Sequence, residues 1–472
     1  MKSRFPSLRT GPWDPALVAA TLLIVVSIAL GGASRQHIVR LALVEIAALP
    51  LLVIACARLI DSGAWRGHRF AVLLVAGVVA IPLIQLVPLP PAVWTGLPGR
   101  DQLVLALDLA GLEPGWTTLS LTPDRTGRSG LALIPPVAMF LGLIAAPHLA
   151  RRLVALYLAA AVISMLLGAA QLASGGESLY PWETTSAGSV NGFFANGNHL
   201  AAYLLVMLPF AMALGAGSLR RAESRSLSLW LAAIFIGMVV IVLAAIRSRA
   251  GIILFVPVML FSLLGAWFAT GRRRPGVPFL LLIGAAGAGA TAVATLSLQS
   301  ILSRFSESAS EGRLDRWPTV AQAAQDNLPL GTGVGSFDPV YRSVEPLAQL
   351  DSTFFNQAHN EYLEIWLETG WLGPALFIAF LVWGFRRAFS AWRGEPSTMR
   401  DLQRAATIGI AAVLAHSAAD YPLRTVTMAT LFALCCALLE IAPPARSSRG
   451  RAAASPQHRE GSLAEAVLRS GS

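Results

Sequence analysis

One short block of the chain, Ala358–Gly373, contains the residues best placed to do chemistry. It reads AHNEYLEIWLETGWLG and closes a long polar stretch in a chain that is otherwise mostly apolar. His359 stands at the expected N-terminus of a short amphipathic helix, Asn360–Thr369. The helix dipole there disfavours an imidazolium, so the ring is expected to stay neutral and able to accept a proton. His359 is therefore a candidate general base for a hydroxyl group; a loop histidine with a structural hydrogen bond is the alternative.

Arginines elsewhere in the chain indicate what such a base would act on. Arg247 and Arg249 flank Ser248 between two apolar runs. A guanidinium keeps its proton and holds diphosphate oxygens through a fixed fork of donors. Further polar residues are expected on the same face of the membrane: Asn198, His199, Arg304, Arg313, Arg316, Arg342, Asp420 and Arg424. Such a lining suits a phosphate-bearing substrate at the membrane surface. The alternative for Arg247 and Arg249 is that they only mark the turn between two spans, or extend to lipid head groups.

Two other motifs have ordinary structural interpretations. Gly331-Thr332-Gly333-Val334-Gly335 resembles a loop that wraps a phosphate with backbone N–H groups. No strand is expected before it and no Lys-Ser or Lys-Thr pair follows, so a tight turn is favoured. Glu361, Glu364 and Glu368 recur at helical spacing, and we expect at least two of them to face solvent. No catalytic triad and no cluster with metal-ligand spacing is evident, which predicts chemistry without metal or cofactor.

Composition sets the class of protein. Hydrophobic residues make up 55% of the 472 positions and charged residues only 13%, as is typical of a polytopic membrane protein. The net charge of +10 comes almost entirely from arginines in short runs between apolar stretches, so nucleic-acid binding is not indicated. The three cysteines fall in apolar segments, so no disulfide framework is expected to hold the polar stretch. We predict an all-α membrane protein with membrane lipids as its surroundings.

Apolar runs long enough to cross about 30 Å of hydrocarbon predict about 12 transmembrane helices. The runs are 15–33, 38–57, 70–88, 129–147, 152–173, 193–216, 228–246, 250–270, 277–297, 371–392, 403–421 and 424–442. Arginine-rich connections alternate with poorer ones, and 174–192, of the opposite phase, has no lysine or arginine. The positive-inside rule then places both termini in the cytoplasm and the long polar stretch outside.

These spans divide the chain into four expected parts. They are 1–297 (spans one to nine), 298–370 (a large outer loop), 371–442 (spans ten to twelve) and 443–472 (a disordered cytoplasmic tail). Within the first part, 89–128 is expected to be an amphipathic cover whose tryptophans, Trp94 and Trp116, sit at the membrane interface. The loop is expected to contain short helices, one of them within Arg313–Gln325 and entered through Trp317-Pro318.

Several of these blocks together resemble the O-antigen ligase/polymerase superfamily. The similarity lies in the Gly331–Phe337 block, in His359-Asn360-Glu361-Tyr362-Leu363-Glu364, and in Glu368–Gly373. Further similar blocks are Phe194–Ala201, Ser248–Gly251 and His416–Arg424. The resemblance covers about residues 190–440, whereas the first half matches in hydropathy and span number alone.

The resemblance implies a GT-C-like glycosyltransferase of the bacterial cell inner membrane. Such enzymes transfer a glycan from undecaprenyl diphosphate to an acceptor at the periplasmic face, without metal. His359 would activate or position the acceptor hydroxyl, and Arg249, with Arg247, would grip the diphosphate. The candidate substrate-binding residues are then Arg247, Arg249, Asn198, Arg313, Arg316 and Asn360.

Other functions remain open at this stage. The same chemistry fits a ligase that uses lipid A–core, a polymerase that extends the lipid-linked chain, or an oligosaccharyltransferase to a protein hydroxyl. A transporter is the alternative from another class, and it should carry charges or broken helices near the bilayer midplane. The polar residues here gather on one face instead, which favours an enzyme over a transporter or a scaffold.

Overall fold

A computed structural model gives the arrangement of the chain. It describes residues 14–33, 38–175, 179–182, 189–218, 225–270, 314–350 and 355–442, with positions 284 and 287. Its compact unit spans Met1–Ile441. The tail predicted at 443–472, Arg304, Arg313 and most of the expected ninth span lie outside the described residues.

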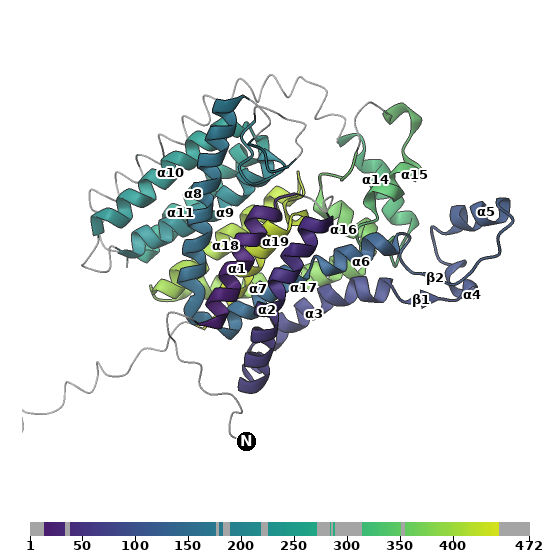
Figure 1. Cartoon of the computed structure of the whole chain (residues 1–472), viewed down its shortest axis with the longest axis horizontal. Helices are drawn as coiled ribbons and strands as arrows, with labels where there is room; N and C mark the ends of the chain where they lie inside the picture. The colour runs from purple at the N-terminus through teal and green to yellow at the C-terminus, as the bar shows by residue number, and fades with distance from the viewer. Residues whose placement is uncertain are drawn as a thin grey trace, which may run out of the picture. The chain divides into compact units, whose positions relative to one another are not determined.

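The described residues are almost entirely helical, which confirms the predicted all-α membrane fold (Figure 1). The helices of the membrane-spanning part are α1 (Pro15–Leu30), α2 (Ile38–Ser62), α3 (Arg69–Gln85), α6 (Pro123–Leu131), α7 (Ile134–Ala145), α8 (Ala150–Ser174), α9 (Gly197–Ser218), α10 (Arg225–Ile246), α11 (Arg249–Ala269), α17 (Leu372–Arg393), α18 (Thr398–Ser417) and α19 (Val426–Glu440). The short helices are η1 (Ala64–His68), α4 (Pro91–Trp94), α5 (Asp101–Leu109), η2 (Pro147–Leu149), α14 (Trp317–Asp326), α15 (Phe337–Val344), η3 (Leu347–Gln349), α16 (Glu361–Thr369) and η4 (Pro422–Arg424).

Most predicted spans coincide with these helices. Among the described residues, 7 helices are long and apolar enough to cross a membrane, and α1, α19 and Trp230–Ile246 are shorter apolar helices. The run 277–297 falls mostly outside the described residues, so the total of 12 stays a prediction. The span predicted at 129–147 is divided between α6 and α7, because Pro135 and Pro136 begin a new helix at that point.

The core of the membrane part lies around α9. This helix packs against α8, α10, α11 and α18, and nearly every residue from His199 onward is buried (Figure 1). A helix that is apolar on all sides and rich in Gly, Ala and Met suits such a central position, because small side chains let its neighbours approach closely. At one such contact, a Cβ added to Gly251 of α11 would lie 2.9 Å from Ala201 Cβ. The first turns of α9 and α11 are therefore held together.

The region predicted as an amphipathic cover, 89–128, is a folded excursion. Strands β1 (Pro88–Leu89) and β2 (Thr117–Thr118) pair antiparallel at its base, with Pro88 opposite Thr118 and Leu89 opposite Thr117. The expectation of two interfacial tryptophans is wrong for Trp94, which is 1% exposed and donates from Nε1 to the Gly115 carbonyl at 2.9 Å. A large ring with a satisfied N–H is buried at low cost, so it packs inside the excursion.

The described part of the loop predicted at 298–370 has its own small hydrophobic core. Val320 and Ala324 of α14, Phe337 and Tyr341 of α15, and Phe355 pack together. Helix α14 begins at Trp317 with Pro318 in its first turn, which confirms the predicted entry. Helix α16 packs against both α14 and α17, so this small core fixes the position of α16 relative to the spans.

Candidate active site

The backbone holds His359 from both sides. The residue has φ 51°, in the left-handed region that few non-glycine residues adopt. Before it, the Ala358 carbonyl accepts from Trp317 Nε1 at 2.9 Å, and the Ala358 N–H donates to Glu364 Oε1 at 2.6 Å. After it, Asn360 caps α16, its Oδ1 accepting from the N–H groups of Tyr362 and Leu363. The predicted helix and the histidine at its N-terminus are confirmed, and the bound neighbours maintain the strained conformation.

The His359 ring faces a buried carboxylate. Its Nδ1 lies 3.4 Å from Asp420 Oδ1, an ion-pair distance without the alignment of a good hydrogen bond. The side chain of His359 is 13% exposed and that of Asp420 is 1% exposed. The ring packs edge-on against Tyr421, with centroids 4.8 Å apart. With Nδ1 directed at Asp420, Nε2 is the nitrogen left for a substrate proton.

Two more histidines surround the same carboxylate. His199 comes from α9 and His416 from α18, and both are almost fully buried. Burial alone would raise the pKa of Asp420, but the contact with His359 and the charges of His199 and His416 hold that pKa well below its usual range. In the described part of the chain, neither ring nitrogen of His199 or His416 has a hydrogen-bond partner. Asp420 is therefore an ionised group able to orient His359 and to stabilise a charge on it.

This pairing was not predicted from the sequence. His199 and Asp420 were expected on the same membrane face as His359, and His416 was recognised as a motif residue, but no direct contact with His359 was predicted. The sequence did offer one signal of a functional role: Asp420 is an ionisable residue at the end of an apolar run. Among the described residues, no group of three or more His, Cys, Asp and Glu side chains is arranged to hold a metal ion.

The burial of the three glutamates of α16 differs from the prediction. Glu361, Glu364 and Glu368 are all buried, so the expected solvated face is wrong. Arg424 covers them, with Nη2 2.9 Å from Glu364 Oε2 and 2.8 Å from Glu368 Oε2. Glu361 Oε2 accepts from Ser417 Oγ at 2.5 Å. Three carboxyl groups thus share one guanidinium inside the protein.

Burial determines the protonation of this cluster. It raises the pKa of Glu361 to about 7, against the hydrogen bond from Ser417 and the charge of Arg424. Burial also raises the pKa of Glu364 to about 8, with Arg424 opposing and Glu368 adding to the shift. One positive charge cannot balance three buried carboxylates, so part of the cluster holds a proton near neutral pH.

These shifted pKa values predict a pH-dependent stability. Both folded-state pKa values lie above the ordinary 4.5, so the folded protein binds protons that the unfolded chain has released. The stability from these groups is fully present below about pH 4.5 and is lost as pH rises through 7 and 8. In thermal unfolding measurements in detergent, Glu361→Gln should reduce the pH dependence of the free energy of unfolding by up to about 1.4 kcal/mol per pH unit. Replacement of the exposed Glu113 by Gln is the control; an unchanged slope in Glu361→Gln would contradict the buried acid.

The glycine-rich block is a tight turn, in agreement with the favoured interpretation. Gly331, Gly333 and Gly335 all have positive φ, and a Cβ on Gly333 would lie 2.1 Å from Ser120 Oγ. The turn's N–H groups are already used: that of Thr332 donates to the Leu367 carbonyl at 3.0 Å, and that of Gly333 to the Glu368 carbonyl at 2.9 Å. The block therefore supports the C-terminal end of α16 and leaves these donors unavailable to a phosphate.

The predicted substrate-binding residues at the start of α9 and in the hairpin before α11 lie next to each other. Asn198 and His199 begin α9, against which the first turn of α11 packs, so the hairpin with Arg247 and Arg249 lies beside them. Arg247 is exposed, with φ 56°, whereas Arg249 is half-buried at the start of α11.

Arg316 and Asn360 have structural contacts. Arg316 is buried, donates from Nη2 to the Gln349 carbonyl at 2.8 Å, and stacks over the Phe355 ring at 4.9 Å. Phe355 in turn lies 6.1 Å from the His359 ring, so Arg316 supports the histidine through an aromatic neighbour. Asn360 uses its Oδ1 as the helix cap. Substrate contacts by these two residues stay predictions.

Comparison with protein families gives a match to the part of the chain that includes His359. Residues 232–378 match the family model described as O-antigen ligase. This part of the chain is similar to the O-antigen ligase family. The match confirms the resemblance seen in the motifs, and none of the curated proteins compared with the chain matches it.

The O-antigen ligase region includes Arg247, Arg249, His359 and the three glutamates of α16, whereas Asp420 and Arg424 follow it. The family and the apolar helices support a multi-pass membrane protein with a ligase- or polymerase-like role in glycan transfer, acting on lipid-linked glycans in general.

Proposed function

We propose that this protein transfers an oligo- or polysaccharide from undecaprenyl diphosphate to an acceptor hydroxyl, without metal, at the periplasmic face of the bacterial inner membrane. The observation that carries the proposal is the contact between His359, within the stretch that matches the O-antigen ligase family, and the buried Asp420 of the α18–α19 connection, 3.4 Å apart. A carboxylate beside one ring nitrogen leaves the other as a base, which is what an acceptor hydroxyl requires.

The transfer is a single displacement in this proposal. The acceptor oxygen attacks the anomeric carbon with inversion, its proton passes to His359 Nε2, and the bond to the diphosphate oxygen breaks. Undecaprenyl diphosphate leaves with the electron pair. Asp420 holds the Nδ1 side of the ring and stabilises the imidazolium that forms.

The arginine hairpin is the proposed site for the diphosphate. Arg247 and Arg249 lie beside the first turn of α9, which carries Asn198 and His199, and His199 packs against the same Tyr421 ring as His359, with centroids 5.2 Å apart. Charge that develops on the leaving diphosphate is stabilised best by preorganised donors. Arg313 and Arg316 of the loop are further candidates, and Asn198 and Asn360 are candidate contacts to the sugar or diphosphate.

Arg249→Lys tests the grip on the diphosphate. Lysine keeps the charge but not the planar fork, so the rate of glycan transfer in membranes should fall about tenfold. Arg152→Lys, an exposed position in α8, is a matched replacement that should leave the rate unchanged. Full activity of Arg249→Lys would instead identify a residue concerned only with topology.

Deletion of the gene, followed by glycolipid analysis, separates the members of this reaction class. Loss of a ligase should leave long polymer on the lipid carrier, and loss of a polymerase should leave single repeat units. A deletion that alters neither, and that can be complemented for another phenotype, would favour a transporter. We propose lipid A–core or another glycan as the acceptor, with a protein hydroxyl as the alternative.

A further inference from the structure

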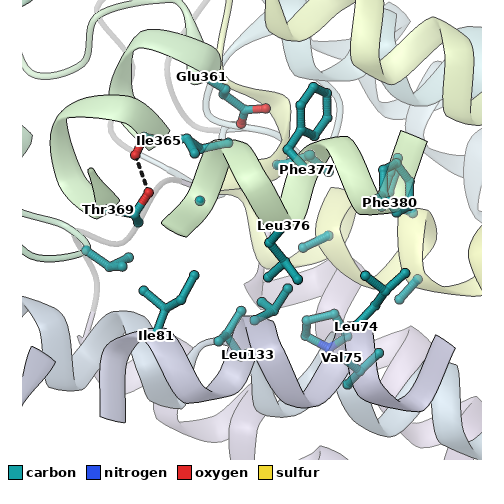
Figure 2. Close-up of a pocket in the computed structure, with 18 of the residues that line it drawn as sticks. Leu74, Val75, Ile81, Leu133, Glu361, Ile365, Thr369, Leu376, Phe377 and Phe380 are labelled. Carbon is teal, nitrogen blue, oxygen red and sulfur yellow. Dashed lines mark hydrogen bonds between the residues drawn. The ribbon is translucent and has the colours of Figure 1, made fainter. Parts of the chain in front are cut away.

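An apolar cavity lies next to α16, and Tyr362, Ile365 and Thr369 of that helix contribute to its lining. Its volume is about 420 Å³, within the range of roughly 300–1,000 Å³ typical of small-molecule sites. Figure 2 shows part of its walls: Leu376 of α17 points toward Leu74 and Val75 of α3, and Phe377 lies beside Glu361. Side chains from α7 and α19 complete the lining. A lining of this kind fits a hydrocarbon chain.

The helices beside the cavity are the most exposed of the candidate spans. Only 11% of the apolar window is buried in the span ending at Gln85, which contains α3, and the same share is buried in α17. Ile378 and Phe385 of α17 are well exposed, as expected of side chains that face lipid. The two helices that wall the cavity are therefore expected to contact lipid on their outer faces.

One polar atom at the end of the cavity has no well-aligned hydrogen bond among the described residues, although the backbone of Leu423 interacts with the same carboxyl group. Glu361 is 4% exposed, and no described residue donates a well-aligned hydrogen bond to its Oε1. Figure 2 shows this carboxyl group at the α16 end of the lining, while Oε2 is occupied by Ser417 Oγ. A buried carboxylate oxygen without a donor is costly, so the site is completed by a ligand that brings one.

The charge at this end restricts the ligand's head group. Arg424 is the one cation among the lining residues, and its ion pairs with Glu364 and Glu368 already use it. A phosphate or diphosphate would meet carboxylates with no cation to balance it. An ammonium would have to lose its water in an otherwise apolar cavity. A hydroxyl has the smallest desolvation cost, donates to a carboxylate and accepts from a carboxylic acid.

We propose that this cavity binds an uncharged membrane lipid, with its hydrocarbon chain between α3 and α17 and a head-group hydroxyl donating to Glu361 Oε1. The site is separate from the arginine hairpin proposed for the diphosphate donor. Its occupant would pack beneath α16, whose Asn360 cap adjoins His359, and so would hold that helix in place.

Photolabelling of the full-length protein in phospholipid vesicles tests the proposal without measuring glycan transfer. The probe is a long-chain alcohol with a diazirine in its chain, and mass spectrometry maps the labelled peptides. We expect labelling around Leu376–Phe380, at least about tenfold stronger than with the same chain ending in phosphate or in a quaternary ammonium. Equal or stronger labelling by the phosphate-ended chain would overturn the proposal.

Matched substitutions locate the site. Glu361→Ala should lower labelling by the alcohol about tenfold but leave labelling by a methyl-ended chain unchanged. Leu376→Trp fills the cavity and should abolish labelling, whereas Ile378→Trp, on the exposed face of the same helix, should not. Competition by unlabelled alcohol in the unsubstituted protein gives the same information if a variant fails to fold. Labelling that neither Leu376→Trp nor competition reduces would refute the cavity as the site.

Discussion

Replacement of His359 by alanine is expected to lower the rate of glycan transfer by roughly 10²–10⁴-fold, the usual contribution of a general base. The reason is geometric: Asp420 faces Nδ1 at 3.4 Å, so Nε2 is directed to the substrate side as the proton acceptor. The measurement is the initial rate of transfer from a lipid-linked donor in isolated membranes. The amount of each variant is determined in the same membranes.

Two further variants separate the base from the backbone. His359→Asn keeps a residue that tolerates φ 51°, so it should fold normally and still be inactive. His148→Ala removes another histidine–carboxylate pair, Nε2 to Asp14 Oδ2 at 2.8 Å, on the face predicted to be cytoplasmic. That change should alter the rate less than about twofold, since the His148 side chain is largely exposed and Asp14 keeps its ion pair with Arg58. Normal transfer by His359→Ala would rule out the base.

Elements determined by local pattern could be predicted from the sequence. Apolar runs of sufficient length become helices because a lipid-facing backbone must satisfy its own hydrogen bonds. The α16 helix could also be predicted, because Asn360 is a strong N-cap before an amphipathic segment. The turn at Gly331–Gly335 followed from glycine's access to positive φ.

Contacts between distant parts of the chain could not be predicted in this way. The spacing of Glu361, Glu364 and Glu368 predicts that the three side chains share one face of a helix. It does not predict which residue packs against that face. The covering residue, Arg424, lies 56 positions from Glu368 in the sequence. Trp94 was misassigned for the same reason, because its partner, the Gly115 carbonyl, comes from a return of the chain that hydropathy does not reveal. Tertiary contacts, rather than local pattern, decide which polar groups are buried.

The ionisable groups form two neighbouring clusters near the start of α16. In one cluster, His359, His199 and His416 surround Asp420; in the other, Arg424 joins the three glutamates. The segment from His416 to Arg424 contributes to both clusters, which explains why so short a connection between α18 and α19 carries so many ionisable residues. Movement of this segment would disturb the orientation of His359 and the support of α16 together.

Asp420→Asn is therefore expected to lower kcat by about 10²-fold or more, with a smaller effect on KM. The amide has nearly the same shape but presents either N–H or C=O to Nδ1, and it does not stabilise an imidazolium. Asp338→Asn, which removes ion pairs with Arg125 and Arg342 at 2.9 and 2.7 Å in the same outer region, is the matched control and should leave kcat unchanged.

The double variant decides whether Asp420 acts through His359. If the carboxylate serves only to orient and stabilise that ring, Asp420→Asn adds no further loss once His359 is alanine, because the two residues act as a unit. Losses that instead multiply would mean that Asp420 contributes independently, for example by holding the connection between α18 and α19. A general fold defect would also lower the thermal unfolding temperature of Asp420→Asn alone. Unchanged unfolding with a non-additive loss of kcat is the result that a positioning carboxylate requires.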